Sequence, residues 1–238
     1  MKIALIGYGK MGKAIEEIAL QQHHEIVLKI DLSNIDEFTK DNIRKADVAI
    51  EFTSPHTAYE NVKKCLEYGV PVICGSTGWL DKLDEIKTIC QQQNGSFLYA
   101  SNFSIGVNLF FELNTYLAKL MSKYEQYEPV ITEVHHTQKK DAPSGTAITL
   151  AEQILANNDC KTSWINQKSN SKQELEIISE RIDPAPGTHI IKYASAIDDI
   201  EITHTAHNRT GFASGAVLAA TFISSRKGIF TMKDVLGL

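Results

Sequence analysis

Residues 133–147 bring several side chains that could do chemistry into one short stretch of the chain. They read Glu-Val-His-His-Thr-Gln-Lys-Lys-Asp-Ala-Pro-Ser-Gly-Thr-Ala. An alternating strand pattern ends in the two histidines, and a helical pattern of apolar residues begins after the Pro-Ser-Gly turn. Imidazole and ammonium groups donate protons, and the N–H groups at a helix N-terminus bind anions. We therefore expect a site for a small dicarboxylate substrate here.

A glycine-rich loop near the N-terminus predicts a nucleotide site. It follows an apolar strand, residues 3–6, and precedes a helical pattern, residues 11–20. In this setting Gly7 permits a tight turn, Gly9 lets the backbone approach a pyrophosphate, and Gly12 lets the helix lie close to the sheet. The residues that we expect at the dinucleotide are Gly7, Tyr8, Gly9, Lys10, Met11 and Gly12.

The end of the second predicted strand bears on the choice of dinucleotide. Asp31 follows residues 26–30, where an acidic residue binds the ribose hydroxyls of NAD. A carboxylate there repels the 2′-phosphate of NADP, and the next residues, Leu32 and Ser33, supply no cation. Lys10 is the only nearby cation that could meet a 2′-phosphate. Asp31 favours NADH, but NADH and NADPH both remain open, as does a solvated aspartate without a ligand.

Two further loops follow strands of the same predicted sheet. Gly75-Ser76-Thr77-Gly78 comes after residues 70–74, and Ala100-Ser101-Asn102-Phe103-Ser104 comes after residues 97–100. Ligands collect at the carboxyl edge of a parallel sheet, and small or hydroxyl residues let backbone groups reach a nicotinamide carboxamide. Either loop alone could be an ordinary turn, but together they favour a ligand site.

The order of elements predicts an α/β fold with two domains. Strands alternate with helices over the first hundred residues, which indicates a Rossmann doubly wound parallel sheet. Longer alternating strands follow at residues 130–137, 175–182, 188–194 and 200–207, which suit a mixed, largely antiparallel sheet. We expect a dinucleotide-binding domain at residues 1–104 and an inserted α+β substrate domain at residues 105–209. Residues 210–238 would return to the first domain, with a helix opened by Ser214-Gly215.

Composition narrows the classes of protein to which the chain could belong. The formal charge of −5 over 238 residues argues against nucleic-acid binding. No apolar stretch approaches the roughly 20 residues of a membrane span, and the first strand runs into the glycine loop without room for a signal peptide. The four cysteines lack a CxxC spacing and are interpreted as reduced, buried thiols. We expect a cytoplasmic protein.

The stretch His-His-x-x-Lys-x-Asp-Ala-Pro-Ser-Gly-Thr behind a nucleotide loop closely resembles the dihydrodipicolinate reductases of bacterial lysine and diaminopimelate synthesis. The resemblance also covers residues 7–12, 75–78, 100–106 and the end of the chain from Arg209. It implies hydride transfer from NADH or NADPH to the dehydrated form of 4-hydroxy-tetrahydrodipicolinate, giving tetrahydrodipicolinate. It also implies a homotetramer assembled through the second sheet.

The resemblance assigns roles to individual residues. His135 is implied as the general acid/base, Lys139 as the second catalytic residue and His136 as a substrate contact; which of His135 and Lys139 delivers the proton stays open. Neighbouring strand residues face opposite sides, so His135 and His136 can share a cleft only if the strand ends or bends there. Gly145 and Thr146 would offer N–H groups to a substrate carboxylate. The implied nicotinamide residues are Gly75, Ser76, Thr77, Ala100, Ser101, Asn102 and Phe103.

Other constellations give weaker interpretations. His135, His136, His204 and His207 suggest zinc, but no acidic or thiolate partner sits at ligand spacing, so we expect no metal. Cys74 could serve a semialdehyde dehydrogenase as a nucleophile, although a buried strand thiol is the preferred interpretation. The chain could also be a two-domain reductase for another amino-acid precursor, or a nucleotide-sensing protein without catalysis.

Overall fold

The computed structural model describes residues 1–208 and 210–238. The chain forms two compact units, one of Met1–Ile105 with Thr210–Leu238 and one of Gly106–Arg209. Arg209, where the resemblance at the C-terminal end begins, lies outside the described residues. No helix in the described part of the chain is long and apolar enough to cross a membrane.

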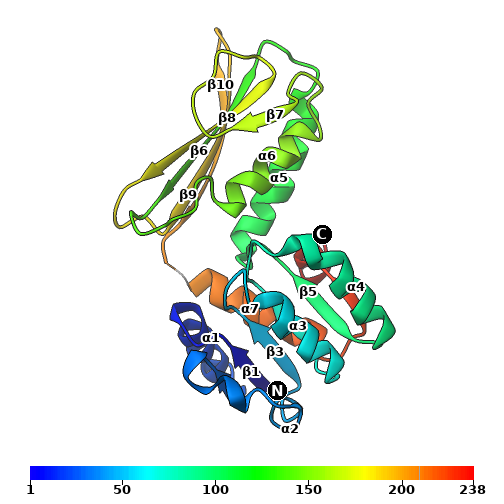
Figure 1. Cartoon of the computed structure of the whole chain (residues 1–238). Coiled ribbons are helices and arrows are strands. Elements are labelled where there is room, and N and C mark those ends of the chain that lie inside the picture. The colour runs from blue at the N-terminus through cyan, green and yellow to red at the C-terminus, as the bar shows by residue number, and fades with distance from the viewer. Residues whose placement is uncertain (209) are drawn as a thin grey trace. The chain divides into compact units, whose positions relative to one another are not determined.

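The first unit is built on a six-stranded sheet with the order β11-β5-β4-β3-β1-β2, and every pair of neighbouring strands is parallel. This confirms the predicted Rossmann sheet (Figure 1). The strands are β1 (Lys2–Ile6), β2 (Glu25–Ile30), β3 (Val48–Glu51), β4 (Val72–Cys74), β5 (Ser96–Tyr99) and β11 (Gly228–Phe230). The helices are α1 (Lys10–Gln21), α2 (Lys40–Ile43), α3 (Ala58–Glu67), α4 (Leu83–Gln92), α7 (Thr210–Ile223) and α8 (Met232–Leu236), with short 3-10 turns η1 (Leu32–Glu37) and η2 (Leu80–Lys82).

Apolar side chains cover both faces of this sheet. Ile3 and Leu5 of β1 pack in a core with residues of α1 and α7, whereas Ala4 and Ile6 pack with residues of α3 and α4. Alternate residues of one strand therefore enter different cores, which is why β1 is apolar from Ile3 to Ile6 rather than alternating.

The C-terminal segment differs from the prediction. Helix α7 begins at Thr210, so Ser214-Gly215 lies inside the helix and does not open it. Gly215 is needed for close packing, because a Cβ there would lie 1.8 Å from the carbonyl oxygen of Phe103. Strand β11 and helix α8 were not predicted, since each is short.

The second unit contains a mixed five-stranded sheet with the order β10-β9-β6-β8-β7. Strand β9 runs antiparallel to β6 and β10, while β8 runs parallel to β6 and β7. Helices α5 (Ile105–Met121) and α6 (Gly145–Leu155) contribute to the apolar core against one face of the sheet (Figure 1). The strands are β6 (Glu128–His135), β7 (Ser163–Ile165), β8 (Glu174–Arg181), β9 (Gly187–Ala194) and β10 (Asp199–Ala206).

The cysteines only partly match the prediction. Cys65, Cys74 and Cys90 are buried free thiols, but Cys160 is exposed. Cys160 lies in the irregular segment between helix α6 and strand β7 and is not among the residues of the apolar core of this unit. The interpretation of all four as buried was wrong for this residue.

Gly215→Ala should destabilise the first unit, because the new methyl group would overlap the backbone of Phe103. Overpacking of this kind costs about 1–3 kcal/mol or more, which exceeds the gain of about 1 kcal/mol from Ala in a helix. The matched control is Gly211→Ala in the same helix, where a Cβ lies 3.5 Å from Ser104 Oγ. Urea unfolding measures both; equal stability of the two variants would contradict the packing argument.

Candidate active site

Strand β6 delivers the predicted catalytic histidine. Its residues alternate in burial, so that Ile131, Glu133 and His135 share the buried side. The strand ends at His135, whose carbonyl accepts a hydrogen bond from the N–H of Ile182 at 2.7 Å. His136 lies beyond this end and is half-buried. Strand β6 thus ends between the two histidines, as strand geometry requires if both are to face one cleft.

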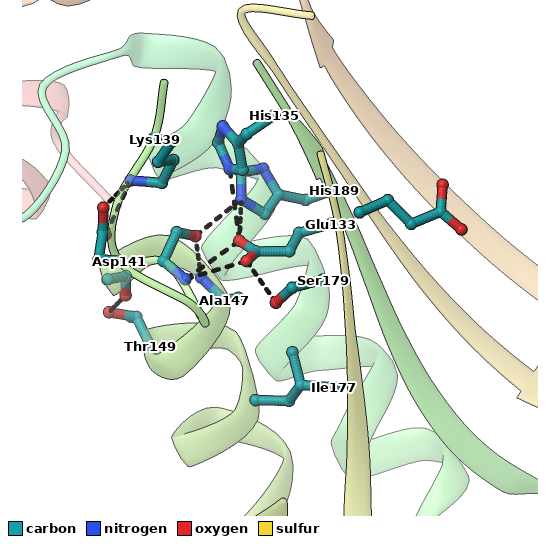
Figure 2. A network of polar contacts seen from close by, with 12 residues as sticks. Glu133, His135, Lys139, Asp141, Ala147, Thr149, Ile177, Ser179 and His189 are labelled. Atoms are coloured by element: carbon teal, nitrogen blue, oxygen red, sulfur yellow. Dashed lines mark hydrogen bonds and ion pairs between the residues drawn. The ribbon is translucent and has the colours of Figure 1, made fainter. Parts of the chain in front are cut away.

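Glu133 is the centre of a buried polar network. Its carboxylate is completely buried and accepts hydrogen bonds from the N–H of Ser144, at 3.1 and 3.2 Å, and from Ser179 Oγ at 2.7 Å. Arg181 Nη2 lies 3.4 Å from Glu133 Oε1. Figure 2 shows the two imidazoles of His135 and His189 directed at the same carboxylate. The network joins three strands to the start of helix α6.

The two imidazoles lie at unequal distances from Glu133. His135 Nε2 is 3.3 Å from Oε2, an ion-pair distance without hydrogen-bond alignment, and His189 Nε2 is 3.8 Å from the same oxygen. Their ring centroids are 5.1 Å apart, edge to face. Gly187, at φ +157°, makes room for this arrangement, because a Cβ there would lie 2.9 Å from the ring of His135.

The network keeps Glu133 charged and His189 neutral. Burial opposes ionisation of Glu133, but the nearby His135 and the hydrogen bonds from Ser144 and Ser179 outweigh it and hold the pKa of this carboxyl well below its ordinary value. Burial, reinforced by repulsion from His135, lowers the pKa of His189 to about 3. At neutral pH the carboxylate is therefore charged and His189 is neutral.

Lys139 lies in the loop after β6 and is held by an ion pair. Its Nζ is 2.8 Å from both carboxylate oxygens of Asp141 (Figure 2). The backbone carbonyl of Asp141 accepts a hydrogen bond from Arg181 Nη2 at 2.6 Å. Asp141 thus braces the loop, and Lys140 is exposed.

Helix α6 begins where the signature ends. Ser144 is its N-cap, and Ser144 Oγ accepts a hydrogen bond from the N–H of Ala147 at 3.2 Å. Gly145 and Thr146 are the first two residues of the helix. A Cβ on Gly145 would meet nothing within 4 Å, so the space over this helix start is open. An open helix start can receive a carboxylate.

Sequence reasoning missed Ser179, Arg181 and His189, and gave Glu133 no role. The register of the sheet explains their positions: Glu133 pairs with Ser179 on one side and His189 on the other, and His135 pairs with Arg181. The alternation of β6 could have placed Glu133 beside His135. The partners on β8 and β9 depend on strand pairing, which the linear sequence does not show.

The cluster also corrects the argument against a metal. Ligand atoms of Glu133, His135 and His189 lie within 4.8 Å of one another, so an acidic partner does stand near the histidines. Arg181 and the two serine donors already engage this carboxylate, which opposes the entry of a dication. His204, by contrast, lies in β10 beside Phe110, with ring centroids 5.9 Å apart, and His207 follows β10.

The glycines of the first unit have the geometry of a dinucleotide loop. Gly7 has φ +95°, and a Cβ there would lie 2.1 Å from the carbonyl oxygen of Phe52. A Cβ on Gly12 would lie 2.3 Å from the carbonyl oxygen of Gly7, whereas one on Gly9 would meet nothing within 4 Å. Gly7 therefore makes the tight turn, Gly9 leaves the backbone open to a ligand, and Gly12 allows close packing of the helix. A pyrophosphate site requires all three.

A cavity of about 280 Å³ opens at the carboxyl ends of β1, β2 and β3. Of the predicted cofactor residues it brings together Gly7, Tyr8, Gly9 and Asp31. Lys10 is exposed and Met11 packs against the core, and neither lines this cavity. The lining residues that sequence reasoning missed are Ile6, Ile30, Leu32, Ile35, Phe52, Thr53, Ser54, Thr57 and Asn61.

The chain has a second cation close to Asp31 in sequence, which corrects the statement that Lys10 is the only one. Lys29 lies two residues before Asp31, near the end of strand β2, and Asp31 follows that strand as the N-cap of η1. Its Nζ is 2.9 Å from Glu16 Oε1 and 4.9 Å from the ring centroid of Tyr8. Asp31 itself accepts a hydrogen bond from the N–H of Leu32 at 2.8 Å.

Phe52 connects the two loops predicted at the nicotinamide. Its ring centroid is 5.6 Å from that of Phe103, and a Cβ on Gly75 would lie 2.2 Å from the ring of Phe52. The N–H of Thr53 donates to Ser76 Oγ at 2.8 Å. Thr77 is exposed, and Ala100, Ser101 and Asn102 follow β5 at the same carboxyl edge, outside the lining of the cavity.

Cys74 has the surroundings of a structural thiol rather than those of a nucleophile. The thiol is buried in β4, with Sγ 3.0 Å from Glu51 Oε2. Burial and the neighbouring Glu51 raise its pKa well above the ordinary value for cysteine. The interpretation as a buried strand thiol is confirmed.

Comparison with known proteins decides the family. The family model described as dihydrodipicolinate reductase, N-terminus, matches residues 1–103, and the corresponding C-terminus model matches residues 106–236. The chain belongs to the dihydrodipicolinate reductase family. It is therefore an oxidoreductase with a pyridine nucleotide cofactor.

Relatives match over nearly the whole chain. The 4-hydroxy-tetrahydrodipicolinate reductase of Christiangramia forsetii is 49% identical over 99% of this chain and 98% of its own length. The enzyme of the same name from Methanocaldococcus jannaschii is 36% identical over 98% of this chain and 81% of its own length. A dipicolinate-bound dihydrodipicolinate reductase from Paenisporosarcina sp. TG-14 has a TM-score of 0.75 at 24% identity, covering 97% of each chain, and supports the fold.

Proposed function

We propose that this protein reduces the dehydrated form of 4-hydroxy-tetrahydrodipicolinate to tetrahydrodipicolinate, the reaction of lysine and diaminopimelate synthesis for which its relatives are named. One observation carries the proposal: the buried Glu133–His135 network lies against the start of helix α6 in a chain of this family. That grouping offers a proton donor and an anion site within one unit, as a cyclic dicarboxylate requires.

The second unit binds the substrate. A carboxylate of the substrate lies over the start of α6, where Gly145 and Thr146 present N–H groups and no side chain blocks Gly145. Lys139, held as an ion pair with Asp141, adds positive charge, and His136 contacts the substrate beyond the end of β6. These groups offset the charge of a dianion before the reaction begins, which lowers the barrier without reorganisation.

The first unit binds the cofactor, whose nicotinamide supplies the hydride. Gly7, Gly9 and Gly12 hold the pyrophosphate, and Asp31 holds the adenosine ribose. The loops after β4 and β5, which Phe52 and Ser76 join, hold the nicotinamide end. Hydride addition leaves enamine character on the substrate ring, and His135 quenches it by donating a proton. The carboxylate of Glu133 lies 3.3 Å from Nε2 of that imidazole and orients it toward the start of α6.

The second unit also forms the oligomer. Strand β10 is an edge of its sheet, and much of the strand is exposed, including Ile200. Exposed edges and apolar residues of this kind are covered in stable proteins, and a second copy of the chain supplies such cover. The proposed assembly is a homotetramer, which acts in the cytoplasm.

A coupled assay tests the reaction. The product of the preceding synthase, supplied fresh, should cause oxidation of the reduced nucleotide by the purified protein. Precursors of other amino acids, offered as keto and imine acids, serve as controls and should be turned over much more slowly. Preference for one of these would indicate a different reductase, and tight NADH binding without turnover of any would indicate a nucleotide-sensing protein.

Removing the proton donor should lower kcat and spare cofactor binding. His135→Ala and Lys139→Ala should each reduce kcat by roughly 10²–10⁴, the range typical of general acid catalysis and charge stabilisation. Lys140→Ala, the exposed neighbour, is the matched control and should retain normal kcat. Near-normal kcat in both test variants would show that the roles are misassigned.

Asp31 should give a modest preference for NADH. Its carboxylate accepts hydrogen bonds from a ribose diol and repels a 2′-phosphate. We expect a higher kcat/KM with NADH than with NADPH at one ionic strength, and a smaller ratio in Asp31→Ser. Asp36→Ser, an exposed aspartate in the following 3-10 segment, is the control. A clear NADPH preference that disappears in Lys10→Ala or Lys29→Ala would show that a lysine controls the choice.

A further inference from the structure

Building on the proposed function, we infer that Glu133 is a positioning residue that keeps the proton of the His135–His189 pair on His135 and fixes that imidazole beside the start of α6. The reductase signature in the sequence begins with histidine, and Glu133 stands two residues before it, completely buried. The inference follows from what each carboxylate oxygen contacts.

The two oxygens of Glu133 have different neighbours. Oε1 accepts from Ser179 Oγ at 2.7 Å and lies 3.4 Å from Arg181 Nη2. Oε2 faces the imidazoles of His135 and His189. The N–H of Ser144 lies between them, at 3.1 and 3.2 Å. One oxygen thus anchors the group to β8, and the other is aimed at the histidine pair.

Only one of the two imidazoles can carry a charge easily. With ring centroids 5.1 Å apart, two imidazolium ions would repel each other strongly in a buried site. His135 is nearer to the carboxylate, at 3.3 Å against 3.8 Å, and His189 is the more buried of the two. The low pKa of His189 agrees with this assignment.

The charged and titratable neighbours support the same distribution. Arg181 and Lys139 oppose a further positive charge near the pair, which makes the negative charge of Glu133 decisive. His189 Nε2 lies 3.3 Å from Ser144 Oγ, so a neutral imidazole already has a polar neighbour there. The charged or titratable groups around the pair are Glu133 on β6, Lys139 and Asp141 in the loop after it, Arg181 on β8 and His204 on β10, with His136 next along the chain.

One carboxylate therefore joins the acid to the substrate site. It holds His135 through charge and the N-cap residue Ser144 through its N–H group. Loss of the charge should move the alkaline limit of the reaction to lower pH, whereas loss of the shape alone should misplace His135 without moving that limit.

The experiment compares Glu133→Gln, Glu133→Asp and Glu180→Gln by the pH profile of kcat/KM. The last is the matched control, because Glu180 is an exposed glutamate on β8, next to Arg181. In Glu133→Gln the pH above which kcat/KM falls should move down by about 1 unit or more, a tenfold loss of activity on the alkaline side. In Glu133→Asp and Glu180→Gln the pH above which kcat/KM falls should stay near its wild-type value. Glu133→Asp should nevertheless have a lower kcat than the wild type.

Separate outcomes identify which statement fails. Wild-type protein without turnover overturns the proposed function and this inference together. Active wild type with an unmoved profile in Glu133→Gln overturns the inference alone, because a purely structural glutamate would lower activity at every pH equally. Binding of NADH, measured by fluorescence, reports whether each variant is folded. If Glu133→Gln does not fold, Ser179→Ala removes the anchor of Oε1 and keeps the charge: lower kcat with an unmoved profile supports the inference, and normal kcat overturns it.

Discussion

The burial of one negative charge, on Glu133, is the constraint on which the second unit depends. A carboxylate without solvent is tolerated only where donors and positive charge surround it. Ser144 at the start of helix α6 meets this need together with Ser179 and Arg181, which both lie on strand β8. The start of helix α6, strand β8 and the end of strand β6 are therefore fixed together by the same group that faces His135. A substitution of Glu133 would therefore affect both the stability of this unit and the position of His135.

The first unit depends on a steric constraint instead. The carbonyl of Phe52 lies where a side chain on Gly7 would be, and the ring of Phe52 lies where one on Gly75 would be. Phe103 packs against the same ring and is itself approached by helix α7 at Gly215. The absence of side chains at three glycines thus lets loops from β1, β4 and β5 converge around one aromatic residue. Such convergence places backbone groups at the carboxyl edge of the sheet, where a dinucleotide binds.

The sequence predicted the features that depend on local patterns. Alternation of strands and helices gave the parallel sheet, and the glycine loop and the histidine–lysine signature gave the candidate sites. Features that depend on pairing between distant strands were missed: His189 and Arg181 reach the site only through the register of β6 with β9 and β8. The start of α7 was misplaced because Ser214-Gly215 resembles a helix start in the linear sequence. The glycine is instead required inside the helix, because the backbone of Phe103 packs against it. Cys160 was interpreted as buried because a thiol is apolar, but it lies in an irregular segment outside the apolar core of the second unit.

Each unit contains a completely buried glutamate near its candidate site, yet the two have different consequences. Glu51 accepts a hydrogen bond from the N–H of Thr53 at 3.0 Å and lies beside the thiol of Cys74, so its close partners are neutral donors that shape a loop. Glu133 holds the N–H of Ser144 in the same way but also faces two imidazoles. A buried carboxylate can influence proton transfer through a neighbouring group that itself gains and loses a proton. Histidine is that neighbour near neutral pH, which is why the glutamate on β6 can govern proton transfer while the one on β3 governs backbone shape.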